Sequence, residues 1–125
     1  MASTIDTLTI DCADPTRVAA FWCSALGYEL VESDDEVAEI RDPSGVGWPL
    51  LFQVVPEGKS VKNRIHLDIR ASASMAAEVE RLEGSGATMQ RLVEEGDSFW
   101  TIMLDVEGNE FCVLRGPEDG WAPDA

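Results

Sequence analysis

The stretch RIHLDIR, residues 64–70, decides the fold because part of it repeats an earlier segment. Residues 7–10 read TLTI and residues 66–69 read HLDI, so the two segments align 59 positions apart with an apolar residue at every second place. This alternation is typical of a strand with one buried face. Gly27 and Gly86, which end two helical patterns, are separated by the same 59 positions. We therefore predict that the chain is a tandem duplication.

Each copy reads as a strand, an amphipathic helix and three further strands. In the first copy, Asp14 and Pro15 supply an N-cap and a first-turn proline, and Gly27 ends the helix. The predicted strands are 4–12, 28–32, 37–41, 49–55, 64–70, 88–93, 99–105 and 110–114, and the second helix is 75–82.

These elements predict an α+β fold of two tandem βαβββ modules. We expect a curved, partly open mixed sheet with the helices on its convex side. The chain is expected to be one domain, residues 1–125. Its predicted parts are module one, about 4–55, a connector, 56–63, module two, about 64–115, and a tail, 116–125, with no regular structure.

Composition and charge exclude several classes of partner. The 125 residues carry 9 Lys and Arg against 24 Asp and Glu, a net charge of −15, which would repel nucleic acid and anionic membranes. No apolar run approaches the roughly 20 residues of a membrane span. Residues 1–6 lack the features of a signal peptide, and the three cysteines match no disulfide or zinc pattern. We expect a cytoplasmic protein with reduced thiols.

Four segments, in this order, resemble the vicinal oxygen chelate superfamily, and more narrowly its glyoxalase-like, bleomycin-resistance-related group. They are DCADP at 11–15, followed by Phe21-Trp22 and LGY at 26–28, then KNRIHLD at 62–68 and DVEGNEFC at 105–112. The resemblance covers residues 4 to 115. It implies the paired-module fold and a homodimer, since a second chain commonly closes the open sheet in this superfamily. It leaves the activity open, because the superfamily contains isomerases, lyases, dioxygenases, transferases and drug-binding proteins.

The resemblance also implies where a metal would bind. In metal-dependent members the ligands are a His on the first strand, a His on the fifth and a Glu on the last, and these positions fall on Thr7, His66 and Cys112. A threonine hydroxyl is a poor ligand for Zn²⁺ or Fe²⁺, although Cys112 could bind as a thiolate. We therefore expect no metal and no cofactor, and metal-dependent glyoxalase or dioxygenase activity is the least favoured interpretation.

Strand alternation predicts which side chains face the hollow of the sheet. If Leu67 and Ile69 pack beneath a helix, then His66 and Asp68 face the hollow together with Cys112 of the last strand. The pattern leaves open which side of 99–105 faces the same way. The full set of candidate ligand-binding residues is Thr7, Thr9, Trp48, Gln53, His66, Asp68, Trp100, Met103 and Cys112.

His66 and Asp68 are two apart on one strand face, so the carboxylate could orient the imidazole as a general base. A purely structural hydrogen bond is the commoner role for such a pair. Cys112 could act as a nucleophile with His66 only if their two strands adjoin, and a buried cysteine is usually a packing residue. Trp48 either covers the mouth of the cavity, contacts a partner chain or pins its own loop.

The sequence is compatible with three functions. The leading hypothesis, implied by the resemblance, is a metal-independent protein that sequesters a drug or metabolite, for example an aromatic or polyketide-like antibiotic. The alternative is an isomerase or lyase that uses His66 as a general base with Asp68. The third is an interaction module whose acidic surface meets a basic partner. The residues favour binding over catalysis without deciding between them.

Overall fold

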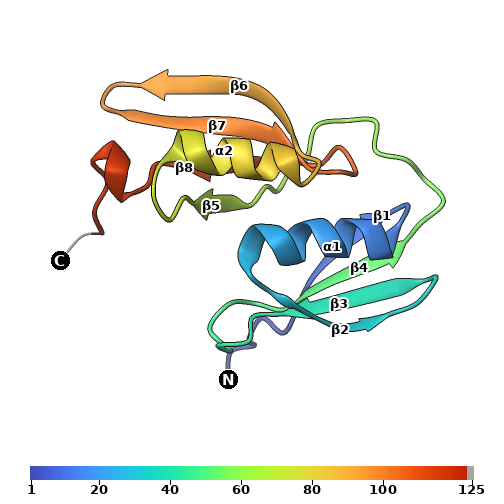
Figure 1. Cartoon of the computed structure of the whole chain (residues 1–125). Coiled ribbons are helices and arrows are strands. Elements are labelled where there is room, and N and C mark those ends of the chain that lie inside the picture. Colours follow the sequence, from blue (N-terminus) through green and yellow to red (C-terminus); the bar gives the residue numbers. More distant parts are fainter. Residues whose placement is uncertain (124–125) are drawn as a thin grey trace. The chain divides into compact units, whose positions relative to one another are not determined.

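The computed structural model describes residues 1–123, which form two compact units with their boundary in the chain between Lys59 and Ser60 (Figure 1). The first unit contains β1 (Leu8–Cys12), α1 (Pro15–Leu26), β2 (Glu29–Ser33), β3 (Val37–Arg41) and β4 (Leu50–Val54). Its sheet has the order β1-β4-β3-β2, with β1 parallel to β4 and the other pairs antiparallel.

The second unit repeats this arrangement. It contains β5 (Asp68–Arg70), α2 (Met75–Gly84), β6 (Thr88–Glu95), β7 (Ser98–Leu104) and β8 (Glu110–Leu114), with the sheet order β5-β8-β7-β6. The parallel pair is again formed by the first and last strands of the unit. The predicted α+β fold of two βαβββ modules is thus confirmed, with one open four-stranded mixed sheet in each unit.

Both helices begin where the sequence predicts, because each has a side-chain cap. Asp14 Oδ1 accepts the Arg17 N–H at 3.1 Å, and Ser74 Oγ accepts the Ala77 N–H at 3.1 Å. Gly27, at φ 70°, ends α1 in the left-handed conformation that glycine adopts without strain.

Each helix covers one face of its own sheet (Figure 1). In the first unit, Val18, Phe21 and Trp22 of α1 form the core with buried residues of β3 and β4. In the second unit, Val79 and Leu82 of α2 lie among the buried residues that face them from the sheet, which are Thr101, Met103, Phe111 and Val113. Thr101 Oγ1 donates to Met75 Sδ at 3.4 Å, which satisfies the hydroxyl inside this core.

Two strands begin four residues later than predicted, because a strand requires a ladder partner. β1 begins at Leu8, opposite the first residue of β4, instead of at residue 4. β5 begins at Asp68, opposite Cys112 of β8, instead of at residue 64. Residues 64–66 therefore precede the ladder, although Leu67 O still accepts the Cys112 N–H at 2.9 Å.

The tail prediction was wrong for Pro117–Asp119, which form a 3₁₀ turn. The Asp119 carboxylate holds it by accepting the Gly116 N–H at 2.9 Å and the Met75 N–H at 2.7 Å. Trp121 then lies beneath the Arg70 guanidinium, 4.0 Å from the ring centre. Residues 124–125 of the predicted tail lie outside the described residues.

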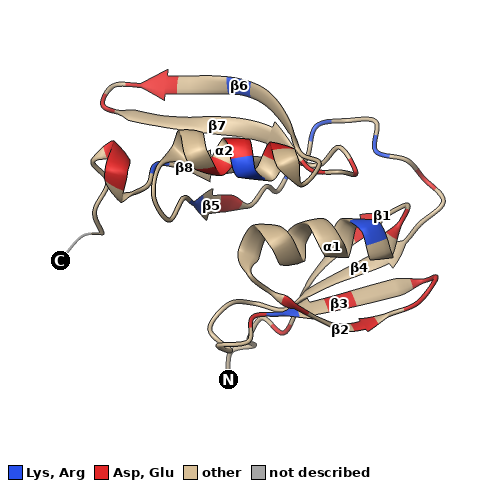
Figure 2. Cartoon of the chain, in the orientation of Figure 1, with Lys and Arg blue, Asp and Glu red and all other residues tan. Residues whose placement is uncertain are grey.

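Acidic side chains are spread over both units, including the edge of the first unit formed by β2 and β3 (Figure 2). Neither helix within residues 1–123 is both long enough and apolar enough to cross a bilayer.

Candidate functional site

The site lies on the face of the second sheet that α2 leaves uncovered. Directly paired residues share a face of the sheet, and Asp68 and Ile102 both pair with Cys112, from opposite sides. In the next row, Trp100 pairs with Leu114. The question that the sequence left open is thus settled, because Trp100 and Ile102 share the face of Cys112 whereas Thr101 and Met103 face α2.

This face holds a pocket of about 330 Å³. Its polar side is formed by charged groups and a histidine, and its apolar side by a tryptophan and two aliphatic residues. The lining residues are Lys62, His66, Asp68, Trp100, Ile102, Glu110, Cys112 and Leu114.

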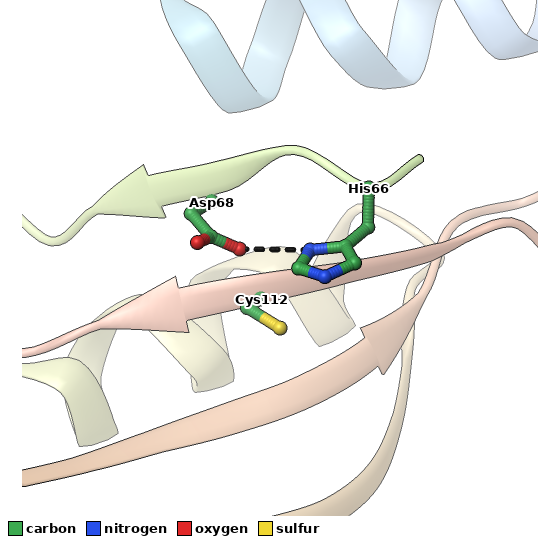
Figure 3. Close-up of side chains that lie close together, drawn as sticks. All are labelled: His66, Asp68 and Cys112. Atoms are coloured by element: carbon green, nitrogen blue, oxygen red, sulfur yellow. Dashed lines mark hydrogen bonds and ion pairs between the residues drawn. The ribbon is translucent and has the colours of Figure 1, made fainter. Parts of the chain in front are cut away.

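His66 and Asp68 form a hydrogen-bonded pair at the polar side of the pocket (Figure 3). His66 Nδ1 lies 2.9 Å from Asp68 Oδ1, and the two side chains are 42% and 48% exposed. An ionised carboxylate can only accept a hydrogen bond, so the ring proton stands on Nδ1. The lone pair of a neutral His66 is therefore on Nε2, which is the arrangement that a general base or a metal ligand requires.

Cys112 lies beside this pair on the neighbouring strand and is only 8% exposed (Figure 3). Burial raises the pKa of its thiol to about 11, and the charge of Asp68 and a hydrogen bond to it add to the effect, while Lys62 opposes it. The strands do adjoin, as a Cys-His pair would need, but the thiol is protonated at neutral pH. This disfavours Cys112 as the nucleophile, since the thiolate is the reactive form.

The predicted residues from the first module do not belong to this pocket. Thr7, Thr9, Trp48 and Gln53 all lie in the first unit. There the Thr7 hydroxyl donates to Asp6 Oδ2 at 2.7 Å, and Gln53 Nε2 donates to Asp11 Oδ1 at 3.4 Å. Trp48 is 52% exposed in the loop before β4.

Met103 was a wrong choice among the candidates. It is fully buried on the α2 side of β7, because β7 turns its odd-numbered residues toward the helix. Its neighbours Ile102 and Trp100 occupy the pocket side instead.

Two lining residues, Lys62 and Glu110, were not predicted. Glu110 could have been found by alternation, because it is two residues before Cys112 on the same strand face. Its Oε2 accepts the Asn63 N–H at 2.9 Å, which fixes the connector against β8. Lys62 belongs to that connector, where no periodic pattern exists to reveal the direction of a side chain.

His66, Asp68 and Cys112 could also hold a metal ion, because one donor atom from each lies within 4.8 Å of the other two. This set differs from the one that the resemblance implies. The set observed here includes Asp68 and does not include Thr7 of the first unit.

Comparisons with known proteins agree on the family. The model of the glyoxalase-like domain matches residues 7–114. The chain therefore belongs to the glyoxalase-like domain family, within the vicinal oxygen chelate superfamily. The comparison with curated proteins gave no match.

Solved structures show the same fold at low sequence identity. A fosfomycin resistance protein, FosX, from Listeria monocytogenes, in a mutant form with Mn(II) and dihydroxypropylphosphonic acid, has a TM-score of 0.74 and 15% identity over 93% of this chain and 92% of that one. A glyoxalase/bleomycin resistance protein/dioxygenase family enzyme from Burkholderia phytofirmans has a TM-score of 0.72 and 16% identity over 89% and 97%. A lactoylglutathione lyase from Agrobacterium tumefaciens has a TM-score of 0.64 and 18% identity over 98% of both chains.

The Mn(II) of the FosX structure prompts the question of whether this chain's residues fit such an ion. Mn²⁺ prefers carboxylate, carbonyl and water oxygens, whereas a thiol occupies the last-strand position here. Thr7 offers only a neutral hydroxyl, already bonded to Asp6. The residues at the implied positions therefore do not fit a manganese site.

Proposed function

We propose that the protein binds a small organic molecule in the pocket of the second unit, using its own side chains and no resident metal. The observation that carries this proposal is the pocket itself, which is lined both by the hydrogen-bonded His66–Asp68 pair and by apolar side chains. A few oriented polar groups on an apolar lining are the usual composition of a ligand site.

The apolar wall suits a flat or aromatic ligand. Trp100 is half-buried and lines the pocket together with Ile102 and Leu114. Stacking on such a ring contributes about 0.5–1.5 kcal/mol beyond the burial of area. The volume of about 330 Å³ is near the lower end of ligand pockets, which favours a small metabolite or one ring system of a larger drug.

The polar side offers both donors and acceptors. Lys62 carries an ammonium group, whereas Nε2 of His66 and the Glu110 carboxylate accept. A ligand with hydroxyl, carbonyl or amine groups at one end of an aromatic body would satisfy both sides of the pocket. Two structural neighbours are a fosfomycin resistance protein and an enzyme of the glyoxalase/bleomycin resistance protein/dioxygenase family, which supports a drug as one class of ligand and antibiotic resistance as one biological role.

A second candidate function, an isomerase or lyase reaction, is favoured by one observation. The 2.9 Å hydrogen bond to Asp68 fixes the His66 ring and leaves Nε2 free to accept a proton from a bound substrate. Asp68 would stabilise the imidazolium that forms.

Native mass spectrometry of protein purified without chelator tests the binding proposal. We expect a retained organic molecule, and we also propose a homodimer, which the same spectra measure. Titration with N-phenylnaphthylamine, an uncharged fluorescent aromatic probe, provides the comparison between variants. Trp100→Ala should weaken its binding by about tenfold or more. Trp48→Ala, which removes an exposed tryptophan of the first unit, should not weaken it. Equal effects of the two substitutions, with no retained molecule, would contradict the proposal.

His66→Ala separates binding from catalysis once the retained molecule is identified. If the protein only binds, the molecule is recovered unchanged from wild type, and the variant loses only a small factor in affinity. If His66 is a general base, wild type converts the molecule, and the variant is slower by about two to four orders of magnitude.

A further inference from the structure

We propose that the ligand of this pocket carries an oxyanion, such as a carboxylate, which is bound by Arg70 of β5. Trp121 of the C-terminal segment holds the guanidinium group in place for this contact. The inference rests on the proposed function, because it describes one group of the proposed small molecule. The acid would lie at one end of the molecule, and the polar groups that meet His66 and Glu110 would lie at the other.

The register of the second sheet places Arg70 on the pocket face. Arg70 pairs directly with Leu114, and Leu114 pairs with Trp100, so the three residues form one row across β5, β8 and β7. Leu114 and Trp100 line the pocket. Glu110 is four residues before Leu114 on β8, which places it about 13 Å away along the strand. The pocket therefore has a cation beside its apolar end and a carboxylate at its other end.

Two contacts hold the Arg70 guanidinium. It lies over the ring of Trp121, 4.0 Å from the ring centre, and its Nη1 donates to Arg115 O at 3.0 Å. Within residues 1–123 this is the one acceptor of the Arg70 side chain, so its other N–H groups are available to a ligand. A guanidinium fixed in this way loses little side-chain freedom when it binds a carboxylate.

The turn that precedes Trp121 fixes the position of the indole ring. The Trp121 N–H donates to Gly116 O at 3.3 Å, and the Asp119 carboxylate joins the turn to the first residue of α2. Gly116 lies so close to Ala73 O that a Cβ at this position would collide with it. The segment after β8 thus packs against the loop after β5, which brings Trp121 to Arg70.

The charge of Arg70 is not neutralised by a carboxylate of the described chain. Arg81, for comparison, forms an ion pair with Glu78 at 2.7 Å, whereas Arg70 forms none within residues 1–123. Asp68 is on the same face of β5, but its carboxylate is engaged by His66 at 2.9 Å. An anion that binds Arg70 therefore does not have to displace an existing ion pair, and charge-assisted hydrogen bonds to it are stronger than neutral ones.

Two fluorescent probes that differ in one group test the proposal. N-phenylnaphthylamine is uncharged, and 8-anilinonaphthalene-1-sulfonate has the same aromatic body with an added oxyanion. Arg70→Gln should weaken binding of the sulfonate by about tenfold and change the affinity for the uncharged probe by less than about twofold. The retained affinity for the uncharged probe would also show that the pocket of the variant is folded.

Two further variants assign the effect to this arginine and its position. Trp121→Leu should weaken binding of the sulfonate by about threefold, because Arg70 loses the ring that holds it. Arg81→Gln is the matched control, since it removes the same charge from α2, which covers the other face of the sheet. It should change neither affinity by more than about twofold.

Three results would overturn the proposal. They are equal losses for both probes in Arg70→Gln, no loss for either probe in that variant, and a loss of sulfonate binding in Arg81→Gln as large as in Arg70→Gln. Failure of the proposed function gives a different result, because wild type then binds neither probe, or Trp100→Ala leaves both affinities unchanged.

Discussion

Asp68 accepts one hydrogen bond from His66 and another from the thiol of Cys112. One oxygen lies 2.9 Å from His66 Nδ1, and the carboxylate also holds the Cys112 thiol in its neutral form. Burial is the largest cause of the raised thiol pKa, and Asp68 supplies the next two. Burial and Asp68 together thus keep the thiol of Cys112, on the neighbouring strand, protonated.

Asp68→Asn should lower the pKa of Cys112 from about 11 toward the ordinary 9.0 without reaching it, because burial persists. Without the nearby negative charge the thiolate forms at lower pH. Alkylation of Cys112 by iodoacetamide should therefore begin at lower pH in the variant, measured by peptide mass spectrometry across a pH series. Asp11→Asn, which neutralises an exposed carboxylate on β1, is the control and should not shift the profile. An unchanged profile in Asp68→Asn would show that burial alone sets this pKa.

At the scale of the elements, the duplication repeats a turn as well as strands and helices. Asp42 and Asp105 each precede a glycine with positive φ, Gly45 at 77° and Gly108 at 83°. Asp42 accepts N–H groups of its own loop, from Ser44 and Gly47, both at 2.8 Å. Asp105 accepts those of Glu107 and Asn109 at 2.8 and 3.0 Å, but it is only 5% exposed.

Asp105→Ala should therefore destabilise the protein more than Asp42→Ala. Removing a buried acceptor leaves backbone N–H groups without a partner or water, at a cost of about 1–3 kcal/mol. Water can replace much of the lost acceptor at the more open Asp42 turn. Urea denaturation of both variants measures the difference in the free energy of unfolding. Equal losses would mean that the burial of Asp105 adds nothing to its role in the turn.

Some elements could be predicted from local signals in the sequence, and others could not. Strand and turn patterns predicted β3 and β8 at their observed bounds, and alternation placed His66 beside Asp68, because both signals are local. The orientation of β7 depends on which of its two partly apolar faces meets α2, and the sequence of one strand does not contain that information. Lys62 and the 3₁₀ turn lie outside any periodic pattern, so only tertiary contacts such as the bonds to Asp119 determine them.

At the scale of the whole molecule, the net charge of −15 opposes folding. Each unit contributes acidic groups, and those along β2 and β3 lie close together on one edge of the first sheet (Figure 2). Basic residues are too few to neutralise them, with 9 Lys and Arg against 24 Asp and Glu. The folded chain therefore holds like charges nearer to one another than the unfolded chain does.

Salt should therefore raise the melting temperature. The screening length falls from ~30 Å at 0.01 M salt to ~8 Å at 0.15 M, so repulsion across a unit is strong at the first concentration and largely screened at the second. We expect a rise of several degrees in Tm by differential scanning calorimetry between these concentrations, at neutral pH. A variant with Glu32→Lys and Asp35→Lys, two substitutions at exposed positions of the acidic edge, should start from a higher Tm at low salt and gain less from added salt. If the wild-type Tm is the same at both concentrations, local ion pairs such as Arg81–Glu78, at 2.7 Å, offset the repulsion, and net charge does not limit stability.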